Sequence, residues 1–451
     1  MSSVRSWIHR TRHMLHEDDV LRSVLRNASL LTSSSGIVIV LSAVQGILTA
    51  RMLGVALWGV LAVAMSFSTI VNLFLSFRMQ AFVVKWVTHF QGDGTARAAT
   101  AFKLAVAGEA GAALVAFAIV ELLAGWGASV FSKNQDFSWI FRSVALLIVL
   151  QAGQQSLTGM LQVDGKFSVQ ALVSMVSQAA SICGIIVVYL AGWGIHGVVD
   201  VVVGAAVVAS ALMWTFGLRA ARDVLPEGWT RQKLVRFGGL GREMTRFAIL
   251  GNLRGTLDSA RNSADLLILG LLSNPLAIGY YKLASSIAQI ANLPNVPLSD
   301  ASLREFCAAF AARSWSDFRT LMGHGSRIAA LWFLPVACGL FVVARPAISL
   351  LYGRSFLPAV PALGILLIAV CVDGILYWAG AALLSMGEPG YLSAVSLLAT
   401  SAKYVLAFLL VPVGGYIAMA AVESFTLVGM NALSARRALQ RLRIRESMAS
   451  E

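Results

Sequence analysis

The feature that most constrains this chain is the recurrence of long apolar segments from about Leu30 to about Leu433. A helix of ~20 apolar residues crosses the ~30 Å hydrocarbon core of a bilayer, where only helices and closed barrels satisfy their backbone groups. Of the 451 residues, 58% are hydrophobic and 13% charged, whereas soluble proteins carry about 25% charged residues. The sequence therefore predicts an all-α polytopic membrane protein with twelve transmembrane helices.

The connections between the apolar segments are too short to form a soluble domain. The two longest hydrophilic stretches, 1–29 and 218–246, hold about 29 residues each, fewer than the ~50 that a domain needs. This excludes a soluble catalytic, nucleotide-binding or sensor domain. The expected parts are a cytoplasmic amphipathic segment 1–29, a six-helix lobe 30–217, a basic cytoplasmic linker 218–245, a second six-helix lobe 246–434 and a basic cytoplasmic tail 435–451.

An internal repeat supports the division into two lobes. At an offset of 220, residues 59–73 match residues 279–293 at six of fifteen positions, including Gly59 with Gly279. Because each unit has an even number of spans, both units enter the membrane from the same side, as in parallel-repeat transporters. We therefore expect a V-shaped bundle of two six-helix lobes around a central site.

The distribution of Lys and Arg predicts the orientation of the chain. With the N-terminus inside, the tails and even-numbered loops hold 26 of the 35 Lys and Arg residues, as the positive-inside rule requires. Both termini are therefore predicted to be cytoplasmic. The net charge of +13 lies between apolar spans and does not indicate nucleic acid, and the four cysteines do not suggest a disulfide or metal framework.

Four charged residues lie inside the seventh predicted span, 246–272, in addition to Arg246 at its first position. Arg254, Asp258, Arg261 and Asp265 follow the spacing i, i+4, i+7, i+11, which places them on one helix face that cannot point toward lipid. One interpretation is a structural ladder of i, i+4 ion pairs. The other is a cavity wall in which the two guanidinium groups bind phosphate oxygens and the two carboxylates orient them.

Further charges inside the spans add candidates for binding and coupling. The supporting cations are Arg51, Lys282 and Lys403, and together they suggest an anionic substrate. Acidic residues could carry H⁺ or Na⁺ for coupling, or could pair with these cations; they are Glu109, Asp200, Asp373 and Glu423. All ten prolines lie at or beyond Pro226, so we expect the C-terminal half to be the more bent, with Pro294 and Pro297 as hinges.

Residues 78–90, with Lys85 and Trp86, predict an amphipathic segment at the inner membrane surface. Among sequence motifs, no Walker loop, HExxH or GxSxG pattern is present, so we expect no catalytic residue and no metal site. No cofactor is predicted, with H⁺ or Na⁺ as the candidate coupling ions.

Four short segments of the chain carry a recognisable pattern. They are Ala50-Arg51-Met52-Leu53-Gly54 with Gly59, Ala264-Asp265-Leu266-Leu267-Ile268-Leu269-Gly270 with Gly279-Tyr280-Tyr281, Leu350-Leu351-Tyr352-Gly353 with Phe356, and Ser385-Met386-Gly387. These segments resemble Wzx-type polysaccharide flippases, which belong to the multidrug, oligosaccharidyl-lipid and polysaccharide exporter superfamily. The resemblance spans nearly the whole chain. It implies transport of undecaprenyl-diphosphate-linked oligosaccharide units from the inner to the outer leaflet of the bacterial cytoplasmic membrane.

On this basis we expect a non-enzymatic flippase for surface polysaccharide biosynthesis, such as O-antigen or exopolysaccharide, acting by alternating access. The implied partners are the polyprenyl-diphosphate-linked oligosaccharide, membrane lipids, and the polysaccharide polymerase and chain-length proteins. Two alternatives stay open. One is a cation-coupled multidrug exporter of the same superfamily, and the other is a membrane polymerase or ligase acting on the lipid-linked oligosaccharide.

Overall fold

The computed structural model describes residues 2–76, 79–91 and 95–450, with side chains described for 36–76, 79–91, 95–248, 263–295, 298–299 and 302–447. Every regular element within these residues is a helix. The first half contains α1 (Ser2–Leu75), α2 (Met79–Phe90), α3 (Thr95–Phe131), η1 (Gln135–Phe137), α4 (Ser138–Leu150), α5 (Gln154–Val163), α6 (Phe167–Ala191) and α7 (Gly194–Val224). The second half contains α8 (Leu240–Leu272), α9 (Pro275–Ala291), α10 (Asn295–Ala311), α11 (Trp315–Leu351), η2 (Arg354–Phe356), α12 (Ala359–Ile375), α13 (Trp378–Ser385) and α14 (Pro389–Ser450).

The helices confirm an all-α, multi-pass membrane protein. Eight segments of the described chain are long and apolar enough to cross a membrane. The helices and the expected spans do not correspond one to one, because α1 and α14 each contain a glycine with non-helical backbone angles, Gly54 and Gly415. The number of twelve spans therefore stays a prediction.

The repeat that the sequence indicated extends to the helix boundaries. Adding the offset of 220 to the bounds of α3, 95–131, gives 315–351, which are the bounds of α11. The short helices η1 and η2, which follow α3 and α11, lie at 135–137 and 354–356, within one residue of the same offset. The repeat is therefore visible in the helix boundaries of this part of each half.

Breaks within the expected spans occur in both halves. Pro294 lies between α9 and α10, where the sequence predicted a hinge, but α4 and α5 are also separate helices although the first half has no proline. Gly153 precedes α5 with φ +81°, a conformation that glycine adopts without steric cost. Proline is therefore not required for such a break, and the expectation that the C-terminal half is the more bent stays a prediction. The side chain of Pro297 lies outside the described residues.

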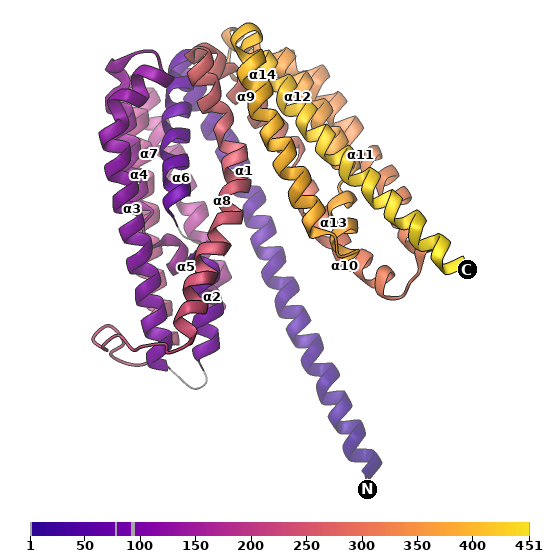
Figure 1. Ribbon diagram of the computed structural model, residues 1–451. Coiled ribbons are helices and arrows are strands. Elements are labelled where there is room, and N and C mark those ends of the chain that lie inside the picture. The colour runs from indigo at the N-terminus through magenta and orange to yellow at the C-terminus, as the bar shows by residue number, and fades with distance from the viewer. Residues whose placement is uncertain (1, 77–78, 92–94, 451) are drawn as a thin grey trace. The chain divides into compact units, whose positions relative to one another are not determined.

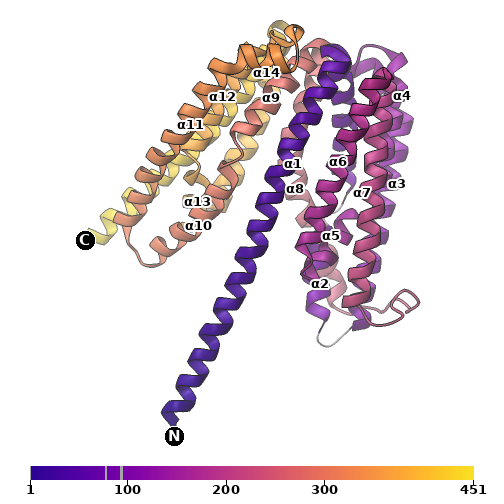
Figure 2. The ribbon, with the colours of Figure 1, turned by 180° about the vertical axis from the view of Figure 1, so that it is seen from behind.

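The chain divides into two compact units. Unit 1 comprises residues 1–52, 68–124 and 139–260, and unit 2 comprises 53–67, 125–138 and 261–451. In unit 1, α6 and α7 lie side by side (Figures 1 and 2), and its core gathers around Trp86, Phe102 and Leu157. In unit 2, α12 lies beside α11 and α14 (Figure 1), and a second core forms around Phe306 and Phe318. The irregular connection 225–239 is shorter than the expected linker, because α7 and α8 extend into it.

Within unit 2, the two repeat-related glycines form one close helix crossing. A methyl group added at Gly59 would overlap the Pro275 carbonyl oxygen, and one added at Gly279 would overlap the Val55 carbonyl oxygen. The offset of 220 exchanges these two contacts, because it relates Val55 to Pro275 and Gly59 to Gly279. The need for close backbone contact in both copies therefore explains the glycine identity of the repeat.

Replacing Gly279 with Ala should destabilise unit 2, because the new methyl group also lies 2.7 Å from Val55 Cγ1 and the helices must separate. Such overpacking costs about 1–3 kcal/mol. The measurement is the thermal unfolding midpoint of the purified protein in detergent. The matched control is Gly323→Ala on α11, where no atom lies within 4 Å of the added methyl group and the higher helix propensity of Ala should slightly stabilise the protein. Equal midpoints for the two variants would contradict the crossing.

Candidate functional site

Three ionisable side chains meet in the interior of unit 2. Lys403 is fully buried, and its Nζ lies 2.6 Å from Asp265 Oδ1 and 2.5 Å from Glu423 Oε2. The Tyr281 hydroxyl donates a hydrogen bond of 2.6 Å to Asp265 Oδ2. Lys403 precedes Gly415 on α14 and Glu423 follows it, so the change of direction at this glycine brings the two side chains together. We call these four residues the ion network; it connects α8, α9 and α14.

The ion network changes the role expected for Lys403. The sequence suggested a cation available to an anionic substrate, whereas here the ammonium group lies between two carboxylates and has no exposed surface. Removing one member of a buried ion pair leaves an uncompensated charge, which is strongly destabilising. Lys403 is thus placed to neutralise Asp265 and Glu423 and to link α8 with the two parts of α14.

Among the remaining candidates of the predicted site, the structure describes the side chains of Arg51 and Lys282. Arg254, Asp258 and Arg261 lie on α8, but their side chains are outside the described residues, so the role predicted for them stays a prediction. Arg51 is exposed on α1 and Lys282 is partly buried on α9.

Glu109, a candidate coupling residue on α3, binds the first turn of α5. Its carboxylate accepts hydrogen bonds from the backbone N–H groups of Gln155 and Ser156, both 3.0 Å, and from the Ser156 hydroxyl, 2.8 Å. The free N–H groups and the helix dipole make the start of a helix favourable for a negative charge. Glu109 therefore fixes the position of α5 in unit 1.

Asp373 on α12 has a different environment, made of neutral amides. The side-chain amides of Asn292, Asn295 and Asn431 donate hydrogen bonds of 3.1, 2.6 and 2.8 Å to its carboxylate. Pro294 lies between Asn292 and Asn295, so the break between α9 and α10 directs both amides toward one acid. The amide oxygens of Asn292 and Asn295 are buried and have no hydrogen-bond partner within the described ranges.

Sequence reasoning missed these asparagines. Asn292 and Asn295 are polar residues that flank a proline inside an apolar segment, which is a signal for a polar interior site. Asn431 is isolated in the sequence and lies 58 residues from Asp373, so nothing local connects the two.

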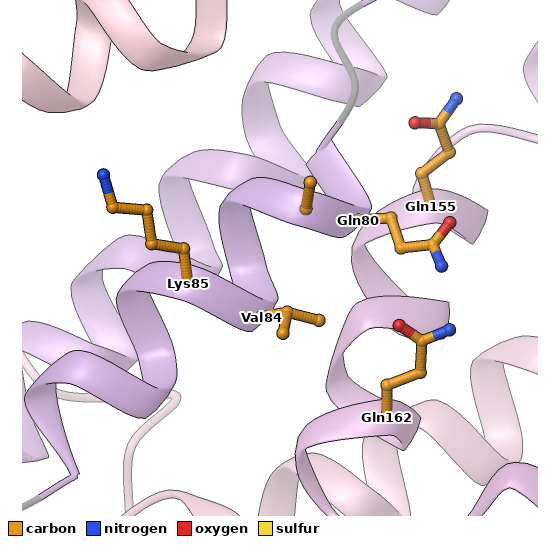
Figure 3. Close-up of a pocket in the computed structure, with 6 residues that line it drawn as sticks. Gln80, Val84, Lys85, Gln155 and Gln162 are labelled. Atoms are coloured by element: carbon orange, nitrogen blue, oxygen red, sulfur yellow. The ribbon is translucent and has the colours of Figure 1, made fainter. Parts of the chain in front are cut away.

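A cavity of about 720 Å³ lies between α2 and α5 in unit 1 (Figure 3). We call it the α2–α5 cavity; the residues that line it are Gln80, Ala81, Val84, Lys85, Gln155 and Gln162. The Lys85 ammonium lies 3.3 Å from Glu243 Oε1 and 4.5 Å from the ring centres of Trp86 and Phe247. Lys85 and Glu243 are 43% and 58% exposed, so this ion pair contributes little to stability.

The burial of side chains on α2 corrects the interpretation of residues 78–90. The sequence predicted a helix on the membrane surface, but Trp86 is 2% exposed and Phe90 5% exposed within the core of unit 1. The apolar face of α2 packs against protein, and its other side carries Gln80 and Lys85 along the cavity. The surface assignment was wrong because both locations produce the same amphipathic pattern.

Comparison with known proteins agrees with the fold. Residues 48–361 match the family model described as Polysaccharide biosynthesis protein. The chain is 24% identical over 354 residues to inner membrane protein YghQ of Escherichia coli (strain K12), a match that covers 76% of this chain and 96% of that protein.

Two solved structures share the architecture. The lipid II flippase MurJ in an inward closed conformation superposes with a TM-score of 0.69 at 12% identity, covering 92% of each chain. A multidrug resistance MATE family transporter of the MOP superfamily, in an inward-facing conformation, gives a TM-score of 0.68 at 15% identity, covering 91% of this chain and 95% of that chain. Both likenesses concern the fold, and the matches confirm the resemblance read from the sequence.

Replacing Lys403 with Met should destabilise the protein by about 3–5 kcal/mol, because Asp265 and Glu423 lose their buried counter-ion. Lys166 provides a matched control, since it also pairs with two carboxylates, Asp164 at 2.7 Å and Asp223 at 2.6 Å, but is 42% exposed. Lys166→Met should leave the thermal unfolding midpoint in detergent nearly unchanged. A similar fall in the midpoint for both variants would contradict the structural role of Lys403.

Proposed function

Because the chain belongs to the polysaccharide biosynthesis protein family, we propose that it is a flippase for polyprenyl-diphosphate-linked oligosaccharides in the bacterial cytoplasmic membrane. The match over residues 48–361 carries this proposal, since it includes helices from both halves of the chain. A flippase of a lipid-linked substrate and a multidrug transporter both have this fold, so the fold alone does not choose the substrate. Polymerase and chain-length proteins are the expected partners in the pathway.

The proposed mechanism is alternating access, with the oligosaccharide and diphosphate carried through a polar interior while the polyprenyl chain stays in lipid. Arg254 and Arg261 remain the proposed ligands of the diphosphate, because a guanidinium group presents two parallel donors to phosphate oxygens. Arg51 and Lys282 are proposed as supporting cations. Asp258 is proposed to orient the arginines, whereas Asp265 and Lys403 are proposed to act within the ion network.

Asp373 is the acid that we propose for coupling to H⁺ or Na⁺. Asp265 and Glu423 already share Lys403, and Glu109 is held by the start of α5. Asp373 receives only neutral amide donors among the described contacts, so its charge is not balanced by a cation there. A proton or a sodium ion could balance this charge, and Pro294 beside the asparagines is the proposed hinge that would respond to it.

The flippase proposal predicts a defined defect in cells that lack the protein. Polyprenyl-diphosphate-linked oligosaccharide should accumulate in the inner leaflet, because the polar head group cannot cross the hydrocarbon core unaided. The measurement quantifies the lipid-linked oligosaccharide and tests its access to a membrane-impermeant probe added to the outer face of the cytoplasmic membrane.

The other outcomes of this experiment favour the alternatives. Unpolymerised oligosaccharide that reaches the outer face would indicate a polymerase or ligase, and no change would favour a multidrug exporter. Expressing variants of the protein in these cells then tests individual residues. Arg261→Ala should fail to restore surface polysaccharide at normal protein abundance, and Arg142→Ala, an exposed arginine on α4, should restore it.

The coupling proposal predicts that Asp373→Asn abolishes transport while the protein remains folded, because the amide keeps the shape of the side chain and removes its charge. The measurement is restoration of surface polysaccharide in the deletion strain at matched protein abundance. Asp200→Asn, an exposed acid on α7, is the control and should restore it fully. Full activity of Asp373→Asn would remove Asp373 from the coupling step.

A further inference from the structure

The α2–α5 cavity is built on a close contact between two helices. Gly159 of α5 is buried, and a methyl group added there would lie 2.7 Å from the Gln80 carbonyl oxygen and 3.0 Å from Val83 Cβ. Gln155, Gly159 and Gln162 follow the spacing i, i+4, i+7 and therefore share one face of α5. That face presents two glutamine side chains to α2, one on each side of the glycine contact.

The backbone of α5 is held in place by Glu109, and the Gln162 side-chain amide donates a hydrogen bond of 3.5 Å to Gln170 Oε1, which leaves its own oxygen as an acceptor. The backbone N–H of Gln155 donates a hydrogen bond to Glu109, which fixes the first turn of α5. Figure 3 shows Gln80 extending from α2 toward the helix that carries Gln155 and Gln162. The cavity is thus lined by amides from two helices whose positions are fixed by packing.

The chemistry of the residues that line the cavity favours a ligand with hydroxyl groups. An amide group both donates and accepts hydrogen bonds, as a sugar hydroxyl does, and Ala81 and Val84 offer apolar surface to the C–H faces of a sugar ring. Lys85 is the one ionised group among the six lining residues, and its ammonium group is paired with Glu243, so the lining presents mainly neutral amides to a ligand. A diphosphate would require several cationic donors, whereas three amides suit a neutral saccharide. The volume of about 720 Å³ lies within the ~300–1,000 Å³ typical of small-molecule sites.

We infer that the α2–α5 cavity binds a sugar residue of the lipid-linked oligosaccharide through Gln80, Gln155 and Gln162. This inference rests on the proposed flippase function and deepens it, because it assigns recognition of the saccharide to a site separate from the arginines of α8. The sugar binds through hydrogen bonds to the amides, so its contribution to affinity is lost when an amide is replaced by an apolar group of similar length.

The test compares two synthetic probes, a polyprenyl diphosphate that carries N-acetylglucosamine and the same polyprenyl diphosphate without sugar. Their dissociation constants are measured with the purified full-length protein in lipid nanodiscs. Wild-type protein should bind the sugar-bearing probe more tightly. Gln155→Met and Gln162→Met should each weaken binding of this probe about three- to tenfold, which is the effect of one lost hydrogen bond, and should leave binding of the sugar-free probe unchanged.

Gln154→Met is the matched control, because Gln154 is the neighbouring glutamine of α5 and does not line the cavity. It should keep the wild-type preference for the sugar-bearing probe. Thermal unfolding midpoints of all three variants establish that they are folded.

Each remaining outcome separates this inference from the proposed function. If wild-type protein binds both probes equally, or if the cavity variants keep the wild-type preference, the inference is overturned and the flippase proposal stands. If wild-type protein binds neither probe, the proposed substrate itself is wrong. Equal loss for both probes would assign the glutamines to the diphosphate and would also overturn the inference.

Discussion

The interaction on which unit 2 depends is the pairing of the Lys403 ammonium with two carboxylates. In the hydrocarbon region water cannot solvate a charge, so a buried lysine must find its partners within the protein. Asp265 and Glu423 supply them, one from α8 and one from the part of α14 beyond Gly415. The ion network thereby fixes the relative positions of helices that are far apart in the sequence. Within it, the buried Lys403 ammonium group lies between two carboxylates.

The sequence predicted the features that are encoded locally or repeated. Apolar segments of sufficient length specify membrane helices wherever they occur, because the bilayer imposes the same requirement on each of them. The match between residues 59–73 and 279–293 includes Gly59 and Gly279, whose reciprocal contacts require a small residue in both copies. Sequence could also place charged residues on one helix face, since the helical period alone determines that arrangement.

Partners and environments could not be predicted in the same way. Lys403 and Glu423 are 20 positions apart on α14, and only the change of direction at Gly415 makes them neighbours. Residues 78–90 were assigned to the membrane surface because an amphipathic helix has the same pattern against lipid head groups as against a protein core. Trp86, buried at 2% exposure, shows that the core is the actual location. The amide lining of the α2–α5 cavity requires two helices at once, so neither contains the signal alone.

The polar groups of the two units differ in chemistry, and this difference bears on the substrate. The cavity in unit 1 is lined by amides and one lysine, with no carboxylate among its lining residues. In unit 2, Asp265 and Glu423 are paired with Lys403, Asp373 with asparagine amides, and Glu388 with Arg437 and Arg441. Amides beside apolar surface match a ligand rich in hydroxyl groups, which is the chemical basis of the inference that this cavity binds a sugar residue.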